Sequence, residues 1–273
     1  MLTNITIGMS SVFLIITLIT IISIRELRNS DRYRLLRHLV IALLLVHFFF
    51  PFLNLKIRNQ VACTFLAGCL HYSLMVAFFW MLIMSTDIYI KIKHSFMDHE
   101  KRFVYCRYIA WIAPGIVVLI TACATRENYA SDGCWLDTDS GAIWTFISCV
   151  CITIMIVLVQ MTVVGVLIYK KSKLPNQSKN DIDTLKRLRT MIGGLLTVTP
   201  VVGIPWMFGI IIIFDDSETM QYIFVILNST QGFFIWLTQC FFSNEVRRAV
   251  KKSLNNKIGP IFDNTSSNTI NTR

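Results

Sequence analysis

Long apolar stretches, separated by short polar segments, recur along the whole chain. A helix needs about 20 mostly apolar residues to cross the hydrocarbon core of a bilayer, where lipid offers no hydrogen-bond partner to the backbone. The pattern therefore predicts an all-α membrane protein, a bundle of seven transmembrane helices. The expected spans are residues 5–24, 35–55, 61–90, 108–124, 142–169, 191–214 and 220–242.

The segment after the last span reads as a short amphipathic cytoplasmic helix. Ser243 is expected to be its N-cap, and Val246 and Val250 fall on one face with arginines and lysines around the other. The polar end of the chain is expected to be disordered. The predicted organisation is a receptor-like seven-helix domain over 1–242, a juxtamembrane helix over 243–255 and a tail over 256–273.

Composition and charge agree with a membrane protein and add an orientation. Hydrophobic residues make up 54% of the chain, charged residues only 15%, and the formal net charge is +10. Of the 26 lysines and arginines, 23 lie in alternate connections and in the carboxyl-terminal segment, which the positive-inside rule places in the cytoplasm. We therefore expect a multi-pass plasma-membrane protein with its amino terminus outside, and membrane lipids rather than nucleic acid as partners of the basic segments.

Two of the eight cysteines fall on the predicted outer side. Cys63 stands where the third span begins, and Cys134 lies in the polar loop before the fifth span. Because thiols in an oxidising compartment tend to pair, these two are expected to form a disulfide across the top of the third helix.

Polar side chains inside the spans are the candidate functional residues. Asn228 and Gln231 share one face of the last span, where a buried carboxamide must find partners on neighbouring helices, and Gly232 beside them allows another backbone to come close. These groups either hold the bundle together or form part of a switch. His71 in the third span is interpreted as a hydrogen-bonded interhelical residue in preference to a metal ligand.

The sixth span is interrupted by residues that weaken a helix. Pro200 and Pro205 each remove a backbone hydrogen bond, and Gly203 lies between them. A helix broken in this way can pivot, with Trp206 at the pivot.

Four stretches carry a resemblance to a known family. They are ACTFLAGCLHYSLMVAFFWML at 62–82, CWLD at 134–137 followed by IWTFI at 143–147, TPVVGIPWMFG at 199–209, and ILNSTQGFFIWLTQCFFSNEVR at 226–247. The chain resembles, over residues 2–252, the seven-transmembrane domain of the adhesion family of G-protein-coupled receptors, which is close to the secretin-like receptors.

The resemblance implies a function and a set of site residues. Cys63 and Cys134 match the family's disulfide, and an agonist in the outer half of such a bundle makes the sixth helix swing outward and opens a cavity for a heterotrimeric G protein. The implied activation switch consists of Pro200, Gly203, Pro205, Trp206, Gln231 and Gly232. The expected ligand pocket is lined by His71, Leu74, Trp135, Trp144, Trp206, Phe208, Asn228 and Gln231. The basic residues on the G-protein side are Lys91, Lys93, Lys186, Arg187, Arg189 and Arg247.

The chain departs from the family at the positions that lock the resting state. Leu36 replaces a histidine and Met84 a glutamate, so both partners of a buried polar pair are absent together, which can be nearly neutral for folding. Asp87, one turn further along, is hypothesised to pair with Arg37 instead. The chain also begins where the family's tethered peptide agonist would end, so it is expected to be either a fragment or a receptor without that device.

Other functions fit less well. An enzyme that uses zinc within the membrane needs a cluster of ligands, but the apolar parts of the predicted spans, with the second counted over 39–55, hold only His47, His71 and the single acid Asp87. No enzymatic activity, cofactor or metal ion is therefore expected. The expected partners are a heterotrimeric G protein and an unknown extracellular or tethered peptide agonist. The alternative that stays open is a non-signalling, receptor-like adhesion partner or scaffold.

Overall fold

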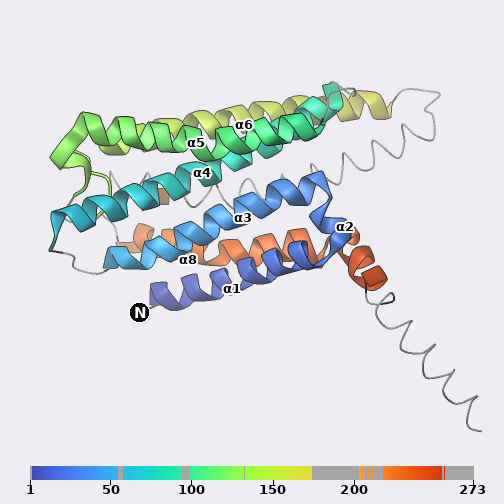
Figure 1. Ribbon diagram of the computed structural model, residues 1–273, viewed down its shortest axis with the longest axis horizontal. Helices are drawn as coiled ribbons and strands as arrows, with labels where there is room; N and C mark the ends of the chain where they lie inside the picture. Colours follow the sequence, from blue (N-terminus) through green and yellow to red (C-terminus); the bar gives the residue numbers. More distant parts are fainter. Residues whose placement is uncertain are drawn as a thin grey trace, which may run out of the picture.

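The computed structural model describes residues 2–54, 58–93, 99–131, 133–173 and 218–253, together with residues 203, 205, 208, 209, 211 and 255. Helices run side by side through this part of the chain (Figure 1). Six of the helices in the described residues are long and apolar enough to span a membrane. These are α1 (Leu2–Ser23), α3 (Asp31–Phe49), α4 (Gln60–Lys93), α5 (His99–Thr125), α6 (Ala142–Ser172) and α8 (Glu218–Trp236).

Six of the seven predicted spans are thus confirmed, with different limits. The largest difference is at α5, which begins at His99, nine residues before the predicted start at 108. Apolar length predicts the part of a helix that lies in hydrocarbon, and the helix itself continues into the polar layer. Most of the sixth predicted span, residues 191–214, and the tail at 256–273 lie outside the described residues.

Short elements connect or extend the long helices. They are α2 (Arg25–Arg28), the 3-10 turns η1 (Phe50–Asn54) and η2 (Arg126–Tyr129), and the π-helical turn η3 (Leu237–Phe241) that follows α8. The side chain of Asn59 caps α4 by accepting hydrogen bonds from the backbone N–H groups of Val61 and Ala62, at 3.0 and 3.4 Å.

A short helix follows η3 within the predicted range 243–255. Residues 244–253 are helical, and the backbone N–H of Val246 donates to Ser243 Oγ at 3.4 Å. Ser243 is therefore the N-cap, as predicted. Val246 and Ala249 are buried in the core of the bundle, while Arg247 and Arg248 are exposed. This helix consequently packs its apolar face against the transmembrane helices.

Helix α4 is the central column of the described bundle. Within its most apolar window 72% of the residues are buried, against 17% to 44% in the other five long helices. It packs against α3, α5 and α6, and α1 packs against α8. Large apolar side chains of α1, α5 and α6 are exposed along much of their length, as expected for helices that face lipid.

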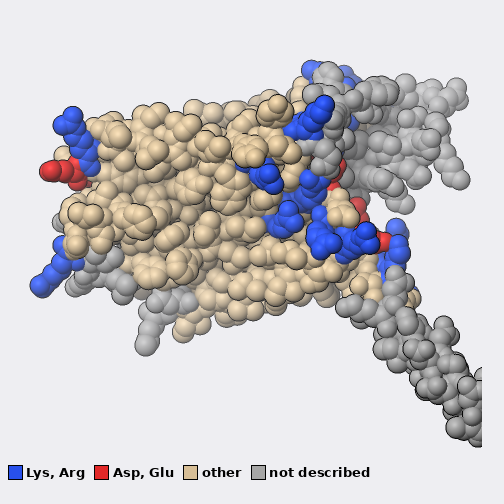
Figure 2. All heavy atoms as spheres, in the orientation of Figure 1, with Lys and Arg blue, Asp and Glu red and all other residues tan. Residues whose placement is uncertain are grey.

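The two ends of the bundle differ in charge. Lysine and arginine side chains gather at one end, over α2, the start of α3 and the start of α5, while the body between the ends is almost free of them on the face shown (Figure 2). We call this the basic end. The opposite end carries the start of α4 and the loop after η2, joined by a disulfide, and we call it the disulfide end.

Candidate functional site

At the disulfide end, the loop after η2 is fastened to α4. A disulfide joins Cys63 of α4 to Cys134 of the loop, and their Cα atoms lie 4.7 Å apart. The adjacent Trp135 stands edge-on to Phe146 of α6, with ring centroids 5.7 Å apart. The predicted disulfide is present, and the tryptophan expected near the pocket packs inward against α6.

His71 lies beneath this loop. It is completely buried, its Nδ1 lies 2.9 Å from the hydroxyl of Tyr129, and its ring meets Phe146 edge-on at 5.8 Å. The contact joins α4 to η2 across 58 residues of sequence. The residue is therefore hydrogen-bonded between elements, the role that the sequence favoured over metal ligation.

The four polar side chains in the middle of α8 are mostly satisfied within their own helix. The amide nitrogen of Asn228 donates to the carbonyl oxygen of Phe224 at 2.9 Å, and Ser229 and Thr230 likewise bond carbonyls of the preceding turn. The expectation that Asn228 bonds a neighbouring helix is wrong, because the carbonyl four residues back is within its reach. Gln231 is different. It is 2% exposed, and its Nε2 has no hydrogen-bond partner among the described residues.

Asn228 also lines a small cavity between α1, α3 and α8. The cavity is about 10 Å³, enough for roughly one water molecule, and His47 of α3 and Ile7 of α1 face it. The Nδ1 of His47 lies 3.2 Å from Ser11 Oγ of α1. The sequence did not single out this pair, although a histidine and a serine inside apolar spans are both unusual enough to suggest a contact.

At Gly232, the backbone of α8 lies in close contact with α1. A Cβ at this position would lie 2.2 Å from the backbone oxygen of Ser10, and the N–H of Gly232 donates to Ser10 Oγ at 2.9 Å. The close backbone approach that the sequence predicted is therefore present, and α1 is the helix that makes it.

At the basic end, a buried arginine connects α3 to the turn after α8. Arg32 donates from Nη2 to Gln239 Oε1 at 2.7 Å and lies 3.7 Å from the carboxylate of Glu245. Next to it, the hydroxyl of Tyr33 is 2.8 Å from Ser243 Oγ. Sequence reasoning missed this group, although a glutamine near the end of an apolar helix was a signal that could have drawn attention to it.

This arrangement can be compared with known families. The family model described as 7 transmembrane receptor (Secretin family) matches residues 1–235. The chain belongs to this receptor family. It therefore has the family's seven-helix fold, and the bundle is a receptor transmembrane domain in a multi-pass membrane protein.

Individual relatives are adhesion receptors. Adhesion G protein-coupled receptor E1 of Homo sapiens is 29% identical over 264 residues, which cover 94% of this chain and 29% of that protein. Adhesion G-protein coupled receptor D1 of Bos taurus is 31% identical over 254 residues, or 89% of this chain and 27% of the relative. Adhesion G protein-coupled receptor L1 of Homo sapiens is 29% identical over 246 residues, which cover 90% of this chain and 16% of that protein. The receptor chain thus spans less than a third of the length of these relatives.

In this receptor the two altered lock positions are apolar and buried. Leu36 of α3 is 0% exposed and Met84 of α4 is 6% exposed, and both belong to the hydrophobic core. The neighbouring residues of α4 supply polar contacts in other directions. Ser85 and Thr86 hydrogen-bond the side chain of Gln160 on α6, at 3.1 Å for the Nε2 to Thr86 contact. At this level α4 is therefore tied to α6.

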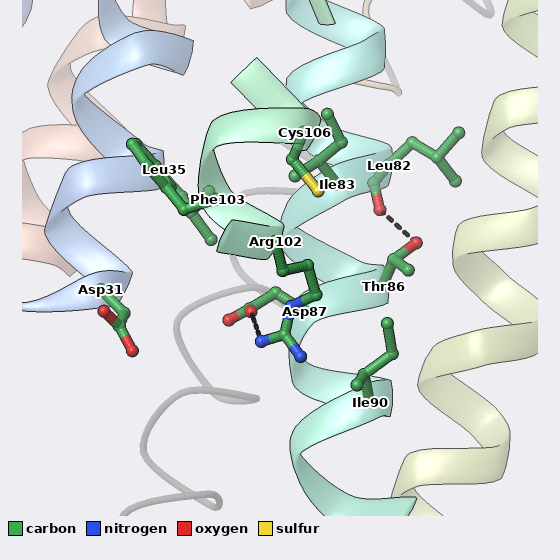
Figure 3. Close-up of a pocket in the computed structure, with 10 residues that line it drawn as sticks. All are labelled: Asp31, Leu35, Leu82, Ile83, Thr86, Asp87, Ile90, Arg102, Phe103 and Cys106. Carbon is green, nitrogen blue, oxygen red and sulfur yellow. Dashed lines mark hydrogen bonds and ion pairs between the residues drawn. The ribbon is translucent and has the colours of Figure 1, made fainter. Parts of the chain in front are cut away.

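Asp87 completes the connections of α4 at the basic end (Figure 3). Its two carboxylate oxygens lie 2.6 Å from Arg102 Nη2 of α5 and 2.7 Å from Lys91 Nζ, and Lys91 lies 3.2 Å from the carboxylate of Asp31 on α3. The hypothesis that Asp87 pairs with Arg37 is wrong. One turn along α4 brings Lys91 to the same side, and α5 extends far enough to place Arg102 opposite.

Three charged residues of this group, Asp31, Asp87 and Arg102, line a pocket between α3, α4 and α5. Its volume is about 130 Å³, and the charged groups of Asp87 and Arg102 are in direct contact within its lining (Figure 3). Apolar side chains form the rest of the wall: Leu35, Leu82, Ile83, Ile90, Phe103 and Cys106, with Thr86 among them.

The remaining predicted site residues are placed as follows. Leu74 is buried at 1% exposure, whereas Trp144 is 50% exposed on α6. Lys91 is engaged by two carboxylates, while Lys93 and Arg247 are exposed. Gly203 and Pro205 are buried and Phe208 is partly buried. Pro200, Trp206, Lys186, Arg187 and Arg189 lie outside the described residues.

Proposed function

We propose that this receptor transmits a signal from an agonist at the disulfide end to a heterotrimeric G protein at the basic end, by movement of its sixth helix. The observation that carries the proposal is the match of the secretin-family receptor model to residues 1–235. The amino terminus then lies outside the cell and the carboxyl terminus in the cytoplasm, because the positive-inside rule directs the basic end inward.

The proposed pocket and switch include two neighbouring residues of α8, Gln231 and Gly232. Gln231 is buried with an amide nitrogen that lacks a described partner, and Gly232 beside it lets α1 and α8 lie in close contact. A ligand or a repositioned sixth helix that offers an acceptor to Gln231 would be favoured, because an unpaired buried amide is costly. The proposed agonist is an extracellular or tethered peptide.

The absence of polar groups at Leu36 and Met84 leads to a specific expectation. No buried hydrogen bond joins these two positions, so their contribution to holding the resting state is apolar packing alone. We propose that the equilibrium between resting and active states is therefore shifted, and that the receptor shows signalling without added agonist.

The test uses cells that lack endogenous Gα subunits. The full chain is expressed, one Gα subunit is restored at a time, and the second messenger is measured at equal surface abundance. Signal through at least one subunit is expected, with loss of that signal in Trp206→Ala and retention in the conservative Trp206→Phe. Silence with every subunit would contradict the proposal and support the receptor-like adhesion partner or scaffold. Antibody access to a carboxyl-terminal tag only after permeabilisation tests the proposed orientation.

A further inference from the structure

Helices α2, α3 and α5 bring four arginines close together at the basic end. Arg34, Arg107 and Arg28 lie close enough to Arg37 for their positive charges to repel its own. No carboxylate among the described residues forms an ion pair with Arg28, Arg37 or Arg107. We call these three residues the arginine cluster.

The cluster lies where one face of α3 meets one face of α5. Phe103, Arg107 and Trp111 are spaced by four residues and therefore share a face of α5, as Arg34 and His38 share a face of α3. The guanidinium of Arg34 lies 4.1 Å from the centroid of the Phe103 ring. The ring of His38 lies 6.0 Å from Phe103 and 6.3 Å from Trp111. Arg107 lies between Phe103 and Trp111 along this face of α5, and its guanidinium lies 5.5 Å from the centroid of the Tyr108 ring.

The floor of this junction is aromatic and belongs to α4. The ring of His38 stacks on Trp80 with a centroid distance of 4.4 Å and an interplanar angle of 7°. Arg37 is six residues into α3 and Arg107 eight residues into α5. At a rise of 1.5 Å per residue these positions lie about 9 and 12 Å from the helix ends, towards the apolar body. From such positions a long arginine side chain can extend its guanidinium towards the lipid headgroups.

A neighbouring charged group at the same end provides a contrast. Asp31, Lys91, Asp87 and Arg102 contain two acids and two bases in direct contact, so their charges neutralise one another. The arginine cluster has three positive charges and no such compensation in the described structure. Within the described residues, the first group is therefore neutral and the arginine cluster carries a net positive charge.

We propose that the arginine cluster binds the headgroup of an anionic phospholipid in the leaflet at the basic end. Guanidinium groups donate paired hydrogen bonds to phosphate oxygens, and the flanking Phe103 and Trp111 suit the interface between headgroup and acyl chain. A phospholipid supplies both the negative charge and the apolar chain at this depth, whereas free phosphate supplies only the charge. The proposal is independent of G-protein coupling, because it concerns the lipid-facing side of the bundle.

The test measures lipid binding by the purified full chain in a neutral detergent. Native mass spectrometry compares dioleoyl phosphatidylserine with dioleoyl phosphatidylcholine, and inorganic phosphate is added as a competitor. The wild-type chain is expected to retain phosphatidylserine preferentially, with no displacement by phosphate at equal concentration. Each arginine near an anionic surface contributes about fivefold in affinity, so Arg37→Gln combined with Arg107→Gln should weaken phosphatidylserine binding roughly 25-fold.

A matched control removes two charges at the disulfide end. Arg58 and Arg126 are exposed there, and Arg58→Gln combined with Arg126→Gln should leave phosphatidylserine binding unchanged. Equal binding of the two lipids by the wild-type chain overturns the proposal, and this arm needs no variant to fold. Unchanged binding in the Arg37→Gln, Arg107→Gln variant, an equal loss in the Arg58→Gln, Arg126→Gln control, or displacement by inorganic phosphate would each overturn it as well.

Discussion

The disulfide end and the basic end of the bundle are held together by different interactions. At the disulfide end a covalent bond joins Cys63 to Cys134, and a neutral hydrogen bond joins the buried His71 to Tyr129. At the basic end the connections between helices are largely ionic. Asp87 pairs with Arg102 on the neighbouring helix, and the side chains of both are only 13% to 14% exposed.

The difference matters for a receptor. A disulfide and a buried neutral hydrogen bond keep one arrangement, because neither finds an equivalent partner elsewhere. An ion pair can instead change partners where a second base is at hand, and Asp87 already contacts both Arg102 and Lys91. The disulfide end therefore supplies a fixed frame, and the basic end is the part whose contacts can change.

The largest effect is expected from opening the disulfide. The bond closes a loop between residues 71 apart in sequence, and removing such a bond costs about 2–5 kcal/mol. Cys134→Ser should strongly lower the melting temperature of the purified receptor and its abundance at the cell surface. The control is Cys123→Ser, which changes an exposed free thiol. Equal stability of the two variants would show that the frame does not depend on the covalent bond.

A smaller effect is expected from the ion pair of Asp87. Asp87→Asn and Arg102→Gln, alone and together, form a double-mutant cycle on a contact of 2.6 Å. The two residues are partly shielded from water, so we expect a coupling energy of about 1–2 kcal/mol in the free energy of unfolding. Additive effects of the two substitutions would mean that the contact contributes nothing to holding α4 against α5. The same cycle with Arg37→Gln in place of Arg102→Gln should show no coupling.

A third variant weakens the disulfide end without touching the disulfide. Tyr129→Phe removes the hydroxyl that lies 2.9 Å from His71 Nδ1 and leaves a buried ring nitrogen without that partner. The expected loss is about 1 kcal/mol, independent of salt because neither group is an ion pair. Tyr105→Phe, at a 70% exposed position of α5, is the matched control and should be neutral. A salt-dependent loss would indicate that charge takes part in holding this end.

Much of this architecture could be predicted from local features of the sequence. The spans follow from apolar length, the helix start at Ser243 from its capping hydroxyl, and the close contact at Gly232 from its missing side chain. The disulfide could be predicted because only Cys63 and Cys134 were expected on the outer side near polar loops. Each inference needs no knowledge of how neighbouring helices are rotated.

The side-chain partners could not be predicted, because they depend on rotation and register. Asp87 was one helical turn from one basic residue and opposite another, and the sequence does not reveal which helix faces it. Asn228 bonded its own helix because local carbonyls compete with distant partners. The contact from Arg32 to Gln239 depends on the π-helical turn at η3, which changes the 3.6-residue period and so the direction of the residues within it.

The smallest effect is expected from the most exposed ion pair of the basic end. Lys252 of the helix 244–253 pairs with Glu26 of α2, and their side chains are 65% and 50% exposed. Such pairs contribute at most about 0.5 kcal/mol, and about 1 M salt screens them beyond roughly 3 Å. Lys252→Ala should therefore lower the melting temperature very little at low salt and not at all at high salt. The control Lys251→Ala should leave it unchanged at every salt concentration. A loss of stability in Lys252→Ala as large as the coupling energy of Asp87 and Arg102 would contradict this expectation. It would mean that the contact between α2 and the last helix is as fixed as the contacts of the disulfide end.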